Sequence, residues 1–182
     1  MIRIRHIGIK IVLMASWAMI GAPARAEEPP SMARATLVYN LSKFVVWPEK
    51  VFSDPDAPCI FCLLGQDDIE KELALLNGQV LNDRKVIFRP VEEPTPPLEC
   101  QVLVIGALEE TDLTAVLKLL EKQPIFTVSD TPRFAKLGGM VEIVSSGTRV
   151  FFHINLDAAK RAGLIIKAPL LQIATVIRET IP

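Results

Sequence analysis

The stretch TVSDTPRFAKLGGMVEIVSSGTRVFFHINLDAAKRAGL, residues 127–164, carries the clearest succession of structural signals in the chain. With the two residues before it, it predicts a strand (125–128), a turn (129–132), a short helical segment ending at Gly138–Gly139, two strands (140–144 and 149–154) and a helix (156–162). The loop between the last two strands has hairpin length and contains a glycine. Asn155 is expected to cap the helix, which ends at Gly163. Nothing in this pattern is typical of a catalytic centre, so the stretch is interpreted as scaffold.

On both sides of this stretch, apolar strands alternate with helical patterns. Strands 58–65 and 100–106 are apolar on both faces, as in the interior of a covered sheet, and a further strand over 81–89 accompanies a turn at Asn82–Asp83. Helices are expected over 32–46, from 67 or 68 to 75 or 76, over 109–120 and over 169–178. The alternation predicts a single-domain α/β sandwich with a mainly parallel sheet, a late antiparallel hairpin and helices on both faces.

The N-terminus has the three parts of a secretory signal peptide. Arg3, Arg5 and Lys10 precede or enter a short apolar run, and Ala24-Arg25-Ala26 provides small residues at a cleavage site. The apolar run is about half the length that a membrane-spanning helix needs. We therefore expect cleavage after Ala26, a flexible tail over 27–31 and one folded domain over 32–182, in a periplasmic protein.

Cleavage changes the charge of the protein. It leaves 16 basic against 21 acidic side chains, a net charge of about −5. An acidic exported chain without basic runs is a poor candidate for nucleic-acid binding.

Three cysteines remain after cleavage. Cys59 and Cys62 match the C-x-x-C spacing of thiol oxidoreductases, but both lie inside a predicted strand, where residues three apart point to opposite faces, with Cα atoms about 10 Å apart. A disulfide between Cys62 and Cys100, on strands that are able to lie side by side, is the better pairing. The alternative is two buried free thiols, and Cys59 is left free or available for an intermolecular bond.

Several polar residues are candidates for a functional site. Asp67 or Asp68 is expected to cap a helix, and two acids after a single glycine argue against a phosphate site. His153 is interpreted as a half-exposed strand residue, and Asp130 after Ser129 as a turn or cap residue, because the glycines of a nucleophile elbow are absent. The pattern offers no metal site.

Trp47 and Tyr39 are the single Trp and Tyr of the mature chain. Trp47 either closes the core where the first helix stops or, with Tyr39, lies at a ligand pocket.

Four segments in order resemble the YfiR family of periplasmic regulators: 39–48 (YNLSKFVVWP), 62–65 (CLLG), 100–106 (CQVLVIG) and the opening stretch from Thr127 to Leu164. The resemblance implies an α/β sandwich, often dimeric, without a catalytic centre or cofactor. It also implies a disulfide at the positions of Cys62 and Cys100, in agreement with the pairing above. Cys59 is not required by the family pattern, and the second cysteine pair that some relatives carry near the late hairpin is absent.

The resemblance further implies repression of an inner-membrane diguanylate cyclase of the YfiN type through its periplasmic region. Capture of the repressor by an outer-membrane lipoprotein of the YfiB type would relieve that repression and so change cyclic di-GMP and biofilm formation. We expect partner contacts at Phe151, Leu170, Ile173 and Ile177. The alternatives are a periplasmic small-ligand sensor and a thiol oxidoreductase.

Overall fold

The computed structural model describes residues 31–95 and 98–178. Its α-helices are α1 (Ser31–Ser42), α2 (Glu70–Ala74), α3 (Glu110–Leu120), α4 (Leu156–Arg161) and α5 (Ala168–Gln172), with a 3-10 turn at Glu49–Val51. Its strands are β1 (Val45–Val46), β2 (Cys59–Leu64), β3 (Val80–Leu81), β4 (Arg84–Val91), β5 (Val102–Ile105), β6 (Phe126–Ser129), β7 (Val141–Ser146), β8 (Arg149–Asn155), β9 (Ile165–Ile166) and β10 (Thr175–Ile177).

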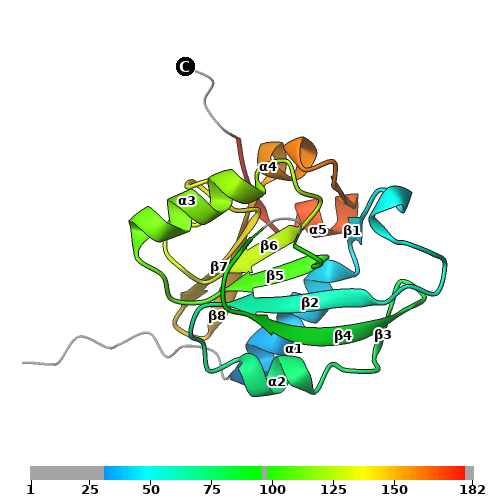
Figure 1. Ribbon diagram of the computed structural model, residues 1–182. Helices are drawn as coiled ribbons and strands as arrows, with labels where there is room; N and C mark the ends of the chain where they lie inside the picture. Colours follow the sequence, from blue (N-terminus) through cyan, green and yellow to red (C-terminus); the bar gives the residue numbers. More distant parts are fainter. Residues whose placement is uncertain (1–30, 96–97, 179–182) are drawn as a thin grey trace, which may run out of the picture.

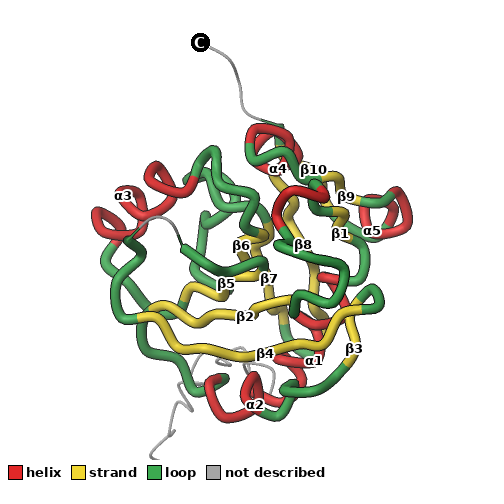
Figure 2. Tube along the Cα trace, turned by 45° about the vertical axis from the view of Figure 1, so that its right-hand side comes forward, coloured by secondary structure: helices red, strands yellow, loops and turns green. Residues whose placement is uncertain are grey.

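The described strands form one large sheet and one small one. The eight-stranded sheet has the order β10-β8-β7-β6-β5-β2-β4-β3 and curls into a half-barrel (Figure 1). Its strands from β7 to β4 are parallel neighbours, whereas β7–β8 and β3–β4 are antiparallel hairpins. The two-stranded sheet pairs β1 with β9 and lies near α5 (Figure 2). The predicted α/β class, mainly parallel sheet and late hairpin are confirmed.

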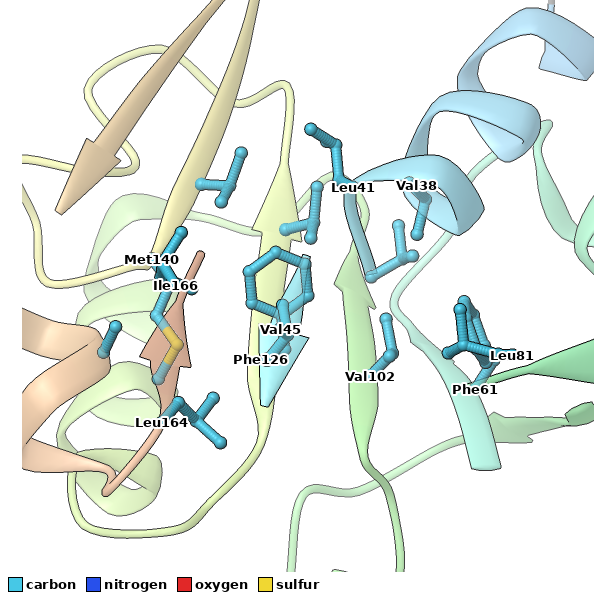
Figure 3. Close-up of a cluster of buried hydrophobic side chains, with 14 of the residues drawn as sticks. Val38, Leu41, Val45, Phe61, Leu81, Val102, Phe126, Met140, Leu164 and Ile166 are labelled. Carbon is cyan, nitrogen blue, oxygen red and sulfur yellow. The ribbon is translucent and has the colours of Figure 1, made fainter. Parts of the chain in front are cut away.

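The central strands contribute to two hydrophobic cores, one on each face of the sheet. Along β2, Phe61 and Leu63 pack into the core that α1 covers, and Cys62 and Leu64 pack into the core that α3 covers. Successive side chains of a strand point to opposite faces, so a strand that is apolar at every position is buried on both. Figure 3 shows the α1 core, in which Val38 faces the strands from the helix. Helices therefore lie on both faces of the sheet, as predicted (Figure 1).

The helix after β8 begins where the sequence indicated. The side chain of Asn155 accepts a hydrogen bond from the Ala158 amide at 2.9 Å and caps α4. Gly163 follows the helix at φ +74°, a left-handed conformation that ends helices readily.

Two predicted helices were too long. α1 ends at Ser42 instead of 46, because Val45 and Val46 pair with Ile166 and Ile165 in β1–β9. The C-terminal helix ends at Gln172, and residues 175–177 form β10 along β8 instead of continuing it. In both places tertiary pairing overrides the helical pattern.

Residues 131–138, predicted to be partly helical, form a series of turns. The Glu142 carboxylate accepts hydrogen bonds from the Arg133 and Ala135 amides at 3.1 and 3.2 Å, and the Asn155 side chain donates to the Ala135 carbonyl at 2.9 Å. Arg133 adopts φ +68°, which interrupts a right-handed helix, and the Ala135 carbonyl is bound by Asn155 instead of by a later amide of a helix.

The strand predicted over 81–89 is a hairpin. Asn82 and Asp83 adopt φ values of +47° and +67°, as in a two-residue turn of type I′, and they join β3 to β4. The predicted turn was therefore correct, but the short strand before it was missed.

The predicted signal peptide and all but the last residue of the tail lie outside the described residues, and Ser31, assigned to the tail, is the first residue of α1. Within residues 31–95 and 98–178, no helix combines the length and apolar character needed to cross a membrane.

Candidate functional site

One buried arginine joins the N-terminal helix to the sheet. Arg34 in α1 has a side chain only 8 % exposed, and its Nη2 donates to Asp67 Oδ1 at 2.8 Å. Its Nη1 donates to Asp130 Oδ2 at 2.6 Å, and Asp68 completes the cluster through Nη2. A guanidinium is suited to this role because its five donors lie in one plane and its charge is permanent.

The cluster lies at the carboxyl ends of the parallel strands. Asp67 and Asp68 follow β2, and Asp130 follows β6. Gly106 allows the loop after β5 to lie against the loop after β2, since a Cβ there would be 2.6 Å from the Gln66 carbonyl oxygen. A cavity of about 670 Å³ opens at this edge, bordered by the Arg34 cluster and by β7. This edge is where ligands usually bind in open α/β sheets.

The prediction that Asp67 or Asp68 is the capping residue of a helix was wrong. The N-cap position of α2 is Ile69, and no side chain caps it. The Asp67 carboxylate accepts the Ile69 amide at 3.0 Å, but both aspartates are bound by Arg34. Asp130 is likewise an ion-pair partner of Arg34 as well as a turn residue.

Ser129 has its hydroxyl engaged with the backbone. Its Oγ donates to the Ile105 carbonyl at 2.6 Å and accepts from the Thr131 amide at 3.1 Å. His153 is partly buried on β8, with Nδ1 3.7 Å from Glu142 Oε2. Because the Glu142 carboxylate is already bound by two amides, this pair is better explained as support for the turn segment than as an acid–base pair.

Cys62 and Cys100 form a disulfide, as predicted. Their Cα atoms are 6.0 Å apart, a spacing that unstrained disulfides adopt. The bond connects β2 with the residue two positions before β5, its parallel neighbour. It closes a segment with a sequence separation of 38 residues.

Cys59 is the cysteine without a disulfide in the described part of the chain, and it is buried. Burial raises the pKa of its thiol to about 12, against the smaller opposing effect of the Arg84 charge. A reactive cysteine needs a lowered thiol pKa and access to solvent. Both properties of Cys59 disfavour the thiol oxidoreductase alternative, as does the pairing of Cys62 with Cys100.

Trp47 closes the core and also borders a cavity. It is largely buried, and its Nε1 donates to the Gln101 carbonyl at 3.1 Å. The cavity, of about 350 Å³, is bordered by Trp47, Phe52 and Cys59 together with Arg84 and Lys167. Both predicted roles of Trp47 are therefore compatible with its position. Tyr39 does not border this cavity; its hydroxyl donates to the Val80 carbonyl at 2.7 Å.

The four residues expected to contact a partner differ in exposure. Phe151 on β8 is 44 % exposed and Ile173 after α5 is 67 % exposed. Ile177 on β10 is partly buried. Leu170 is fully buried in the α1 core, so its side chain is not available to a partner in this structure. The structure adds Val176, 36 % exposed on β10, to this neighbourhood.

The exposed apolar side chains lie near the edge of the large sheet that β10 forms. β10 runs parallel to β8 with Thr175 opposite His153, so the residues just before Thr175 lie towards the Phe151 end of β8. β10 covers only residues 153–155 of β8. Residues 149–152 of β8 therefore have no pairing partner in β10.

A comparison with protein families matches residues 31–175 to the YfiR/HmsC-like family. The match covers nearly the whole described domain, from the first residue of α1 to the first residue of β10.

The chain belongs to the YfiR/HmsC-like family.

This family is regulatory rather than catalytic, and it is periplasmic. Membership fits a periplasmic regulator of cyclic di-GMP signalling that interacts with a periplasmic regulatory partner. The resemblance inferred from four short segments is thereby confirmed over most of the chain.

Sequence reasoning missed the two buried or half-buried arginines that organise this YfiR/HmsC-like chain. Neither Arg34 nor Arg84 was among the candidate functional residues. Their partners are 27 to 96 residues away in sequence. The one available signal was the presence of acids directly after two predicted strands, where a cation is needed to hold them together.

Proposed function

We propose that the protein is a periplasmic negative regulator that binds the periplasmic region of an inner-membrane diguanylate cyclase and keeps cyclic di-GMP low. The observation that carries the proposal is membership of the YfiR/HmsC-like family over residues 31–175. The polar groups weighed above are engaged in structural contacts, which supports a role exerted through the surface. The exposed hydrophobic side chains of Phe151, Ile173 and Val176 supply apolar area for such a contact.

The mechanism is a shift between two states of the cyclase. A regulator that binds the inactive arrangement more tightly than the active one favours the inactive state by that difference in affinity. A competitor, such as an outer-membrane lipoprotein of the YfiB type, lowers the free regulator and releases the cyclase. A homodimer would present the same surface twice. Dimerisation stays a prediction, as does the role of the lipoprotein.

The test combines cells with a purified pair of proteins. Deleting the gene is expected to raise cyclic di-GMP, and the wild-type gene to restore it. The Ile173→Asp variant is expected to fold but to bind the periplasmic region of the cyclase at least tenfold more weakly, because a desolvated charge opposes apolar contact. Binding is measured by calorimetry or surface plasmon resonance with the cyclase of the same organism.

The matched control is Leu75→Asp. Leu75 is 65 % exposed, nearly the same as Ile173, but it follows α2, away from β8 and β10. An unchanged cyclic di-GMP level after deletion would contradict the function. Equal binding of the cyclase by the two variants would contradict the predicted contact surface around Ile173. The proposed function would then be tested by the gene deletion alone.

A small-ligand sensor is the second candidate, supported by the cavity beside Trp47. Its wall combines two aromatic rings with the cationic side chains of Arg84 and Lys167. Calorimetry against nucleotides and aromatic metabolites tests it: heat that disappears in a Trp47→Leu variant supports ligand binding there. Absence of heat with all of them contradicts it.

A further inference from the structure

The segment between Trp47 and Cys59 crosses the surface as a strap. Both neighbours are fixed, since Trp47 donates to the Gln101 carbonyl and Cys59 pairs with Val86 in the sheet. Residues 48–57, here called the strap, contain no fully buried residue. The strap has a single 3-10 turn of regular structure, so its own backbone does little to hold it in place.

One side chain ties the strap to the sheet. Arg84 Nη1 donates to the Asp54 carbonyl at 3.0 Å and to the Ala57 carbonyl at 2.8 Å. The Arg84 guanidinium carbon also lies 3.8 Å from the centre of the Phe52 ring. Among the hydrogen bonds of the described residues, the two from Arg84 are those that join the strap to a non-adjacent part of the fold.

The strap packs two partly buried side chains, Val51 and Phe52, against the α1 core, and it also borders open space. Phe52 borders two cavities, of about 350 and 360 Å³. Trp47 and the buried residue Cys59 also line the first cavity. Because Phe52 borders this space, displacement of its ring would widen the access to Cys59.

We propose that the strap opens and closes over the cavity beside Cys59, and that Arg84 is the latch that holds it closed. Opening requires loss of two charge-assisted hydrogen bonds and one cation–π contact from Arg84, together with the apolar contacts of Val51 and Phe52 with the core. Entry of a small molecule into the cavity is then controlled by this latch. The inference is independent of the proposed binding to a cyclase, and it concerns access to the same cavity as the small-ligand alternative.

The buried thiol provides a reporter for the opening. The mature protein with its disulfide intact is treated with N-ethylmaleimide without reductant, and alkylation of Cys59 is followed by mass spectrometry. Arg84→Met, which keeps the aliphatic stem and removes the guanidinium, is expected to be alkylated at least tenfold faster than the wild type. Lys85→Met is the matched control: it is the same change one residue further along β4, at a side chain that makes none of the three contacts.

The electrostatic effect of the substitution has the opposite sign. The Arg84 charge lowers the pKa of the Cys59 thiol, so its removal raises that pKa and reduces the reactive thiolate. Faster alkylation of Arg84→Met therefore reports access. Equal rates in Arg84→Met, Lys85→Met and wild type would overturn the proposal.

Hydrogen exchange separates strap opening from general unfolding. The amide of Phe61 in β2 is expected to keep its protection in Arg84→Met while alkylation accelerates. A parallel increase in both rates would overturn the proposal, since the thiol would then be exposed by unfolding of the sheet. If Arg84→Met does not fold, the wild-type protein provides the test. Alkylation of Cys59 is then expected to be faster than exchange of the Phe61 amide through opening of β2. Equal rates would refute a strap motion that is separate from the opening of β2.

Discussion

At the scale of single residues, Arg34 connects parts of the chain that are far apart in the sequence. Its guanidinium holds aspartates that are 33, 34 and 96 residues away in sequence, from the ends of β2 and β6. Removing one partner of a buried ion pair leaves the other charge desolvated and unpaired. The mutual repulsion of the remaining carboxylates adds to this cost.

We therefore predict that Arg34→Met lowers the free energy of unfolding by about 3 kcal/mol. The control is Arg133→Met, which removes an exposed ion pair with Glu110 at 3.4 Å and is expected to cost less than about 1 kcal/mol. Urea denaturation measures both, and Arg34→Met/Asp67→Asn is expected to recover part of the loss. Equal costs for the two single variants would show that Arg34 is not a structural centre.

These residue contacts mark the limit of the sequence-based predictions. Burial of Cys62 and the capping by Asn155 were predictable because strand alternation and helix capping are local patterns. The partners of Arg34 and Arg84 were not, because their proximity depends on how the strands assemble. Leu170 was expected at a surface for a related reason: a short apolar segment does not reveal which of its faces is covered.

At the scale of elements, the strands apolar on both faces were the most predictable. β2 and β5 needed only their composition to be placed in the interior of the sheet. The ends of α1 and α5 were wrong because β1 and β10 exist only through pairing with distant strands. Two-residue and three-residue strands carry too few side chains for an alternation pattern.

The disulfide between Cys62 and the start of β5 yields the prediction at this scale. Reducing it is expected to lower the free energy of unfolding by about 4 kcal/mol, because the reduced unfolded chain regains the entropy of an open loop with a separation of 38 residues. Guanidinium denaturation of the oxidised wild type, the reduced wild type and Cys62→Ala/Cys100→Ala measures the effect. A difference below about 1 kcal/mol between oxidised and reduced protein would refute the entropic account.

At the scale of the whole molecule, fold, family and expected export agree. The half-barrel with its two cores accounts for why no local pattern pointed to a catalytic centre: the most regular segments are committed to packing. A disulfide between neighbouring strands suits an oxidising compartment. The exposed apolar side chains near β8 and β10 are where we predict contact with a partner.

Export makes a measurable difference to the thiols. Protein recovered from the periplasm is expected to begin at Glu27 and, after denaturation, to contain one free thiol of its three cysteines. A version that lacks residues 1–26 and stays in the cytosol is expected to contain three free thiols. Intact mass and a thiol titration test both statements, and three free thiols in the periplasmic form would contradict the assignment.

The covalent link across the centre of the sheet also limits how far the chain can be drawn out. A translocating protease or a pulling instrument that grips the two ends gains no length from the residues between Cys62 and Cys100 while the bond is intact. With a separation of 38 residues, the fully stretched oxidised chain is shorter than the reduced one by about 130 Å. A narrow pore must moreover admit a closed loop at this point instead of a single thread, so we expect the oxidised protein to resist threading better than the reduced one.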